Sequence, residues 1–215
     1  MLSLEVALLT DRGGRDYNED ACGHWHSERQ LCCVLADGAG GHGGGDVASR
    51  LAVETLLNAF ADRPTTDGEA LSELVWDTNE ALLGHRASDK RLRDMHTTVV
   101  CLVIDFVDRM AHWSHVGDSR LYWFRDGRLR DRTLDHSLVQ SLINAGVLTP
   151  DQAREHPRRS ELQSALGIRP DLRLNDEDRL RLKAAIGRVG LAGLEKGVLV
   201  DLTMPRSHGF APDNV

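Results

Sequence analysis

Acidic side chains recur at four places where the sequence predicts a turn or the end of a strand. Glu19 and Asp20 close the segment "RDYNED", Asp37 follows the apolar run "LCCVLA", Asp118 lies in "GDSR", and Asp213 begins the final "DNV". Hard divalent cations such as Mg²⁺ and Mn²⁺ take oxygen ligands of this type. Carboxylates packed together without cations would repel one another and be partly protonated. The pattern therefore predicts a carboxylate cluster that binds divalent ions, with turn capping as the alternative role for Asp118.

The glycine-rich segment "LADGAGGHGGG", residues 35–45, has two interpretations. From Gly38 it matches the G-x-G-x-x-G fingerprint of dinucleotide-binding folds. Those folds need a second parallel strand that ends in an acidic residue about 20 positions later. This sequence predicts another helix there, so a dinucleotide-binding module is a remote alternative. In the favoured interpretation Asp37 projects from the end of a rigid strand, and the glycines let backbone and solvent approach it closely.

The elements that must position these residues alternate between strand-rich and helical segments. Apolar residues recur at three- and four-residue steps in 46–62, which indicates an amphipathic helix with Asp46 at its positive end. Asp126-Gly127 predicts a hairpin turn, and Thr149-Pro150 predicts a helix start. Neighbouring strands joined by short turns imply antiparallel pairing and the α+β class. The predicted strands are 2–10, 21–27, 30–37, 96–105, 109–119 and 120–131; the predicted helices are 46–62, 71–87, 137–148 and 160–167.

Composition excludes several classes of protein. The 215 residues suit one domain, and a net charge of −7 argues against a general nucleic-acid binder. No stretch has the pattern of a signal peptide or the length of a membrane span. The four cysteines lack C-x-x-C spacing, which favours free thiols in a reducing compartment. We therefore expect a cytoplasmic protein without nucleic-acid or membrane partners.

Four motifs in order resemble the bacterial metal-dependent protein serine/threonine phosphatases of the 2C type. "RDYNED" is similar to the family's R-x-x-N-E-D, and "DGAGGHGGGDVAS" is similar to D-G-M-G-G-H-x-x-G-E-x-A-S. "GDSR" and the terminal "DN" match outright. The segment 135–167 also resembles the family's flap and the helix after it. The resemblance covers residues 4–167 and the last few residues.

The resemblance implies two antiparallel β-sheets packed face to face with helices on both outer sides. It also implies hydrolysis of phosphoserine and phosphothreonine in proteins by a water held between two Mn²⁺ or Mg²⁺ ions, with a third ion in some members. A phosphorylated protein would be the substrate, and a serine/threonine kinase would oppose the enzyme. The expected arrangement is a single phosphatase-like domain over 1–215, with a family-like core over 1–167 and a flap near 135–158.

Carried over position by position, the resemblance assigns roles to the acidic residues. Asp37 would bridge two metals and the Gly38 carbonyl would bind one of them. Asp213 would bind the second metal and Asp118 a third, weaker ion. Glu19 and Asp20 would act near the metals through water.

Basic side chains near these motifs have expected roles as well. Arg15 matches the arginine that clamps the phosphate with its two-donor fork. A surface ion pair with Asp11 or Glu19 is the competing interpretation. His42 could donate a proton to the leaving alkoxide or form a hydrogen bond within its own loop. His24 and His26 share one face of a predicted strand, but two imidazoles without further ligands favour an exposed or packed face over a zinc site.

The sequence departs from the family pattern after Gly167. The family carries an Asp-Gly after an apolar strand, and no Asp-Gly occurs between 168 and 210. Asp201, after "GVLV", is a weak substitute, and 176–197 looks helical where the family has a strand. We therefore expect 168–210 to be a divergent, truncated or frame-altered segment with incomplete C-terminal strands, before the terminal motif at 211–215. A catalytically impaired domain that binds phosphoproteins and regulates a partner is the alternative function.

Overall fold

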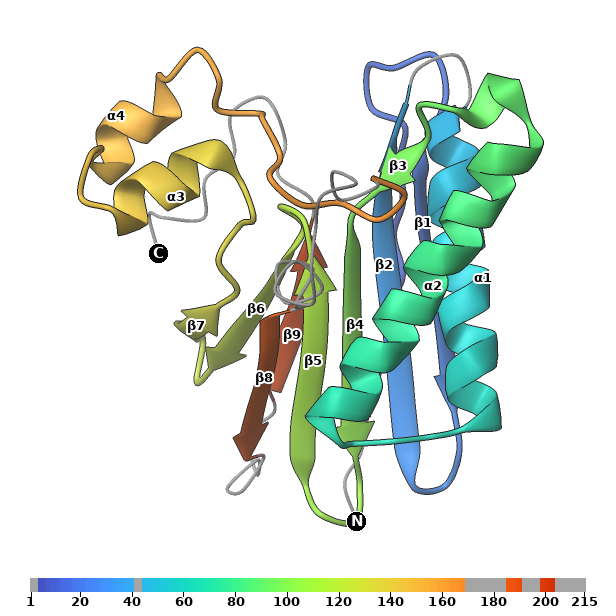
Figure 1. The fold of residues 1–215 in the computed structure, drawn as a ribbon. Helices are drawn as coiled ribbons and strands as arrows, with labels where there is room; N and C mark the ends of the chain where they lie inside the picture. Colours follow the sequence, from blue (N-terminus) through green and yellow to red (C-terminus); the bar gives the residue numbers. More distant parts are fainter. Residues whose placement is uncertain (1–3, 41–43, 169–184, 191–197, 204–215) are drawn as a thin grey trace.

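Two antiparallel sheets packed face to face form the centre of the molecule, and two long helices cover the outer face of the larger sheet (Figure 1). The structure is a computed structural model, and it describes residues 4–40, 44–168, 185–190 and 198–203. The predicted α+β class and sandwich architecture are confirmed. The expected positions of His42 and Asp213 lie outside the described residues.

The larger sheet has the strand order β1-β2-β4-β5-β8, and the short β3 pairs with the end of β2. All of its pairings are antiparallel. Its strands are β1 (Asp20–His26), β2 (Gln30–Ala39), β3 (His96–Thr97), β4 (Val99–Asp105), β5 (Met110–Val116) and β8 (Ala185–Gly190).

The smaller sheet has the order β7-β6-β9, made of β6 (Arg120–Arg125), β7 (Arg128–Arg132) and β9 (Val198–Thr203). Asp126 and Gly127 join β6 to β7 with φ angles of 55° and 71°. Two consecutive positive φ angles define the tight hairpin turn that Asp-Gly favours. The predicted turn is therefore confirmed.

Helices α1 (Gly44–Asp62) and α2 (Gly68–Ser88) pack on the larger sheet through one apolar stripe each. Leu56 and Phe60 of α1 are fully buried. The rings of Phe60 and Trp25 of β1 pack edge to face, with their centroids 5.5 Å apart. Burial of a side chain of this size contributes about 2–3 kcal/mol. The Asp67 side chain caps α2 by accepting from the Ala70 amide at 2.9 Å.

The remaining helices are short: the 3₁₀ turn η1 (Lys90–Leu92), α3 (Leu138–Asn144) and α4 (Pro150–Arg154). Thr149 and Gln152 form a capping box in front of α4, with Pro150 as the first helical residue. This confirms the predicted helix start. Helices α3 and α4 lie on the same side of the molecule as β7 and are drawn above it in Figure 1.

Strand alternation divides the core between the two faces of the larger sheet. Cys32 and Val34 of β2 face the helices, while Leu31 and Cys33 face the smaller sheet, where Leu121 of β6 joins them. Side chains of successive strand residues point to opposite faces, so a continuous apolar run such as "LCCVLA" fits a strand that is covered on both sides.

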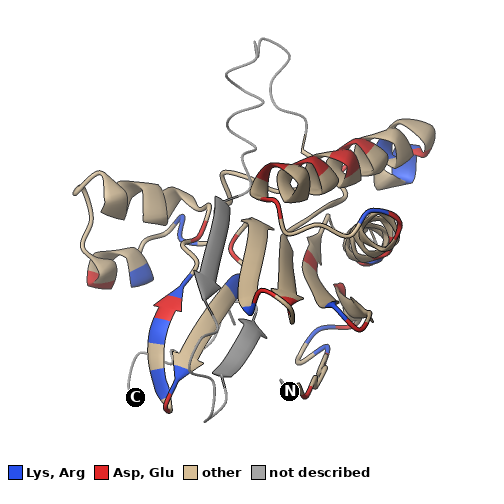
Figure 2. Cartoon of the chain, turned by 90° about the horizontal axis from the view of Figure 1, so that it is seen from below, with Lys and Arg blue, Asp and Glu red and all other residues tan. Residues whose placement is uncertain are grey.

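Charge is segregated on the surface (Figure 2). The exposed stripe of α2 carries acidic residues, whereas arginines concentrate on the hairpin of β6 and β7. Among the described residues, no helix is both long enough and apolar enough to cross a bilayer.

Three predicted elements were wrong. Residues 160–167, predicted as a helix, form no helix, because Leu162 and Leu166 instead make isolated β-bridges with Ser137 and Thr97. Residues 4–10 form no strand and are exposed, because they have no neighbouring strand to pair with among the described residues. The predicted helical stretch 176–197 contains strand β8, which pairs with β5 from Met110 to His115. Pairing with the edge strand β5 outweighs the local helix propensity of these residues. Together with β9, this strand shows that the divergent segment contributes to both sheets.

Candidate metal centre

Two carboxylates face each other where β1 begins and β2 ends. Asp20 and Asp37 are directly paired in the antiparallel register. Like charges placed directly opposite one another across two strands are destabilising. The pair therefore favours either a neutral form of one carboxyl group or a bound cation.

Both carboxyl groups of the pair have raised pKa values. Burial first, and then the charges of Asp20 and Asp118, raise the pKa of Asp37 to about 7, although Arg15 acts in the opposite direction. Burial also raises the pKa of Asp20, with Arg15 again acting in the opposite direction. The pKa of Asp118 is raised by burial and then by the charge of Asp135, against the effect of Arg120. At all three carboxyl groups, burial therefore outweighs the nearby arginines.

The backbone of Asp37 is fixed by two threonines that precede β4. Its amide donates to the Thr98 hydroxyl at 3.0 Å, and its carbonyl accepts from the Thr98 amide and the Thr97 hydroxyl, both at 2.9 Å. Both polar groups of the Asp37 backbone are thus satisfied. The carboxylate is consequently carried on a strand end that has little freedom to move.

Glycines bring the first turn of α1 against the end of β2. A Cβ atom placed on Gly38 would lie 2.0 Å from the Gly45 carbonyl oxygen, and one on Gly45 would lie 2.6 Å from Glu19 Oε1. Only glycine permits such an approach of two backbones. The Gly38 amide donates to the Glu19 carbonyl at 3.0 Å, which ties the segment before β1 to the same point.

Asp118 lies in the turn between β5 and β6. Gly117 has φ +109°, a conformation that side chains rarely adopt, and a Cβ there would approach Thr98 Cγ2 to 2.5 Å. Its amide donates to His136 Nδ1 at 3.2 Å, and its carbonyl accepts from the His136 amide at 2.9 Å. The buried Ser119 hydroxyl lies 2.6 Å from the Thr98 hydroxyl. The turn is therefore held on both sides of Asp118.

Arg15 extends from the exposed loop before β1. Its guanidinium is 62% exposed and lies 3.8 Å from Glu19 Oε2, so the ion pair considered as the competing interpretation is present. Its charge also lowers the pKa values of Asp20 and Asp37, which places it within electrostatic reach of both. An exposed guanidinium beside a carboxylate cluster remains available to a phosphate.

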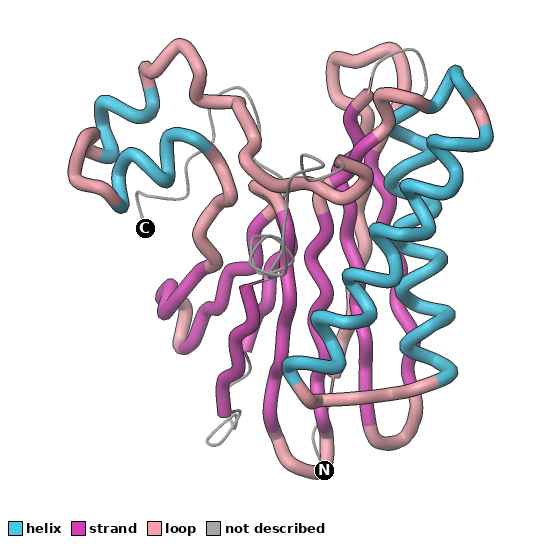
Figure 3. Tube along the Cα trace, in the orientation of Figure 1, coloured by secondary structure: helices cyan, strands magenta, loops and turns pink. Residues whose placement is uncertain are grey.

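Loops gather at the end of the larger sheet where these residues meet (Figure 3). The segment that follows α4 crosses this end, and Leu166 pairs with Thr97 through two backbone hydrogen bonds of 3.1 and 2.8 Å.

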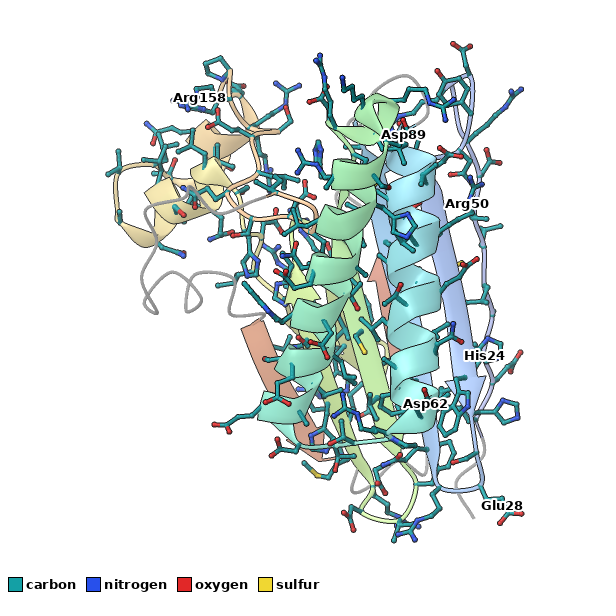
Figure 4. The ribbon with its side chains drawn as sticks, turned by 45° about the vertical axis from the view of Figure 1, so that its right-hand side comes forward. His24, Glu28, Arg50, Asp62, Asp89 and Arg158 are labelled. Carbon is teal, nitrogen blue, oxygen red and sulfur yellow. The ribbon has the colours of Figure 1, made fainter. Side chains whose placement is uncertain are left out.

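Asp46, in the first turn of α1, forms an ion pair with Arg50, and Arg50 is labelled on α1 in Figure 4. His24, labelled on β1 in Figure 4, and His26 are exposed and stack with ring centroids 6.1 Å apart.

The donor set fits a divalent cation in its chemistry. Glu19 Oε1 is buried and has no hydrogen-bond partner among the described residues, and the Asp20–Asp37 pair brings two carboxyl groups together. Within the described part of the chain, no three His, Cys, Asp or Glu side chains are already arranged as a metal site. Of the further ligands expected from the sequence, the Gly38 carbonyl lies at the end of β2, and Asp213 lies outside the described residues. Asp201 pairs through its backbone with Tyr122 of β6, which places it in the smaller sheet.

Sequence reasoning missed three residues that support this site. The first is Thr98, described above. The second is Asp135, whose two carboxylate oxygens accept hydrogen bonds from Nε and Nη2 of Arg120 at 2.6 and 2.7 Å. The half-buried His136 ring stacks on the buried His115 with ring centroids 4.6 Å apart, and burial followed by the charge of His115 lowers the pKa of His136 to about 4. Ser119, through Thr98, and Arg120, through Asp135, brace the turn that contains Asp118. The doublet "TT" before an apolar strand was the one available signal for Thr98.

An α+β sandwich with half-buried carboxylates gathered at the ends of its central strands has the donor chemistry of a metal-binding protein. Comparison with known proteins then gives the family. The sequence profile described as protein phosphatase 2C matches residues 12–168. The chain belongs to this family.

Individual relatives agree. The chain is 34% identical over 180 residues to Protein phosphatase PhpP of Streptococcus pneumoniae, covering 78% of this chain and 71% of PhpP. It is 37% identical over 169 residues to Serine/threonine protein phosphatase PstP of Mycobacterium tuberculosis, covering 77% of this chain and 31% of PstP. A crystal structure of the catalytic domain of PstP with two manganese ions superposes with a TM-score of 0.63 at 30% identity, covering 83% of this chain and 69% of that one.

Proposed function

We propose that this chain is a metal-dependent protein serine/threonine phosphatase that hydrolyses phosphoserine and phosphothreonine in proteins. Family membership gives the reaction class. The observation that carries the proposal at this site is the half-buried, directly opposed pair Asp20 and Asp37, with the Asp37 pKa raised to about 7. A protein that keeps two such carboxyl groups together at a loop-lined sheet end gains from a bound cation there.

The residues proposed to hold the ions are Asp37, the Gly38 carbonyl, Asp118 and Asp213, with Glu19 and Asp20 contributing through water. Mn²⁺ or Mg²⁺ is the proposed cofactor, and the PstP catalytic domain was crystallised with two manganese ions. When bound, such ions lower the pKa of a coordinated water and neutralise charge on the phosphoryl group. The rigid end of β2 orients Asp37, since its backbone amide and carbonyl are both held by threonines.

Arg15 is proposed to hold the phosphate. Its guanidinium is exposed, so a substrate can reach it, and its partner Glu19 keeps it beside the carboxylate cluster. A planar fork donates two hydrogen bonds to two phosphate oxygens, which orients the phosphoryl group. His42 is proposed to deliver a proton to the leaving serine or threonine oxygen. The segment 135–158, which contains α3 and α4, is proposed as the flap beside the site.

A serine/threonine kinase that makes the phosphoproteins is the proposed opposing enzyme. The cytoplasm is the proposed location, supported by four cysteines that are all free. Cys32 and Cys101 lie side by side with their sulfur atoms 3.8 Å apart and do not form a disulfide.

Phosphopeptide hydrolysis with and without Mn²⁺ tests the proposed function. We expect Mn²⁺-dependent release of phosphate, and a loss of about 100-fold or more in the Asp37→Asn variant, because its neutral amide is a poorer metal ligand. Asp108→Asn is the matched control, since Asp108 is exposed in the turn that joins β4 to β5, at the opposite end of these strands from Thr98 and Gly117. Phosphopeptide binding without turnover at any Mn²⁺ concentration would instead identify a regulatory, non-catalytic domain.

A further inference from the structure

One buried threonine contacts the backbones that carry both central carboxylates. Thr98 lies between β3 and β4 and is 3% exposed. Its hydroxyl accepts from the Asp37 amide at 3.0 Å and lies 2.6 Å from the hydroxyl of Ser119, the residue after Asp118. Its own amide donates to the Asp37 carbonyl at 2.9 Å.

The methyl group of Thr98 makes the second connection. Gly117, the residue before Asp118, packs so closely on Thr98 that any Cβ at position 117 would lie 2.5 Å from Thr98 Cγ2. The two ends of the Thr98 side chain therefore meet the two residues that flank Asp118. The hydroxyl meets Ser119 and the methyl meets Gly117, while the backbone holds Asp37.

Hydrogen-bond accounting shows why the hydroxyl cannot be replaced by an apolar group without cost. A threonine hydroxyl has one donor and two acceptor sites. One acceptor site takes the Asp37 amide, and the remaining donor or acceptor serves Ser119, which is 1% exposed. Without the Thr98 oxygen, the Asp37 amide has no other partner within the described hydrogen bonds, and the Ser119 hydroxyl loses its partner as well.

We propose that Thr98 is a positioning residue that sets the separation between Asp37 and Asp118, and through it the relative positions of the cations these carboxylates bind. This inference rests on the proposed function, because it concerns the same metal centre. Thr98 does not contact the ions itself. It determines the relative positions of two ligands from different parts of the chain. Groups that form hydrogen bonds to metal ligands, or that pack against them, commonly orient those ligands in this way.

The alternative is that the Thr98–Ser119 contact only stabilises the fold. A purely structural contact would change the unfolding free energy and leave the metal affinity of the folded protein unchanged. Mn²⁺ affinity, measured by calorimetric titration on folded protein, is therefore the readout that separates the two roles. It does not depend on turnover.

Four single variants provide the comparison. Thr98→Val keeps the shape and removes the hydroxyl, whereas Thr98→Ser keeps the hydroxyl and removes the methyl. Ser119→Ala removes only the partner hydroxyl. Thr133→Val is the matched control, because the buried Thr133 hydroxyl also accepts from a strand amide at 3.0 Å, that of Leu121, and contacts neither Asp37 nor Asp118.

We expect Thr98→Val to weaken Mn²⁺ binding by about 10- to 100-fold, the usual effect of losing a group behind a metal ligand. Thr98→Ser should restore most of that affinity. Thr133→Val should bind Mn²⁺ like the wild type even where it lowers stability. Ser119→Ala should weaken Mn²⁺ binding in the same direction as Thr98→Val, and it carries the test if Thr98→Val does not fold.

Combining Thr98→Val with Ser119→Ala adds a second criterion. If the two hydroxyls act as one unit, the double variant should bind Mn²⁺ no more weakly than Thr98→Val alone. Wild-type affinity in both Thr98→Val and Ser119→Ala would overturn the inference, as would equal weakening in Thr133→Val. A wild-type protein that binds no Mn²⁺ would overturn the proposed function itself, so the two failures are distinguishable.

Discussion

At the scale of single residues, the electrostatic cost of the carboxylate cluster in metal-free protein is concentrated on Asp37. The folded protein holds its carboxyl proton up to a pKa of about 7, whereas an unfolded aspartate releases it near 3.8. Between these values the folded state binds the extra proton, so the stability of the metal-free protein falls as the pH rises. Above pH 7 the folded state bears a buried charge next to Asp20.

Asp37→Asn should therefore stabilise the metal-free protein at pH 8, by about 2–4 kcal/mol at roughly 1.4 kcal/mol per pKa unit. Below about pH 4 the advantage should disappear, because Asp37 is then neutral in the wild type as well. Urea unfolding in the presence of a chelator at both pH values measures this. His136 titrates in both proteins and cancels from the comparison. An Asp37→Asn protein less stable than the wild type at pH 8 would contradict the expectation.

At the scale of elements, the tight turn before Asp118 depends on a glycine. Gly117→Ala would place a methyl 2.5 Å from Thr98 Cγ2 in a backbone with φ +109°, whereas Gly127→Ala, with φ +71°, meets nothing within 4 Å. We expect Gly127→Ala to cost about 1–2 kcal/mol from backbone conformation alone. Gly117→Ala should cost clearly more and should also reduce Mn²⁺ affinity. Equal losses in thermal unfolding would show that the contact with Thr98 can relax.

Several elements could be predicted from the sequence because local signals and tertiary packing agree in them. "LCCVLA" became the doubly covered strand β2, the apolar spacing in 46–62 became α1, and Asp126-Gly127 became the hairpin turn. Residues 185–190 were misread as helical, because only the free edge of β5 makes them a strand. The strand predicted over 2–10 failed for the opposite reason: strand formers without a partner strand remain exposed.

The carboxylates of the site could be proposed from sequence because each lies at a strand end or turn. Their geometry could not. That Asp20 stands directly opposite Asp37 depends on the register of β1 against β2, which a shift of one residue would change. The supporting role of Thr98 depends on its contacts with Asp37 and Ser119, which lie 61 and 21 residues away along the chain.

At the scale of the whole molecule, cation binding should couple to stability in a pH-dependent way. At pH 8, Mn²⁺ at about 100 times its dissociation constant should stabilise the fold by about 2.7 kcal/mol. At pH 5.5 the thermal shift should shrink, because the raised pKa values of Asp37, Asp20 and Asp118 make protons competitors for the same oxygens. Differential scanning fluorimetry measures both shifts, with Asp37→Asn as the control. Equal shifts at the two pH values would contradict the assignment of these carboxyl groups.

The contact between Gly38 and Gly45 has a consequence for how this protein can vary. The end of β2 and the start of α1 touch backbone to backbone, with a Cβ at Gly38 falling 2.0 Å from the Gly45 oxygen. This contact contains no side chain that could be replaced by a slightly larger or smaller one, so even alanine is too large at either glycine. Substitutions elsewhere in the chain must therefore preserve this backbone contact.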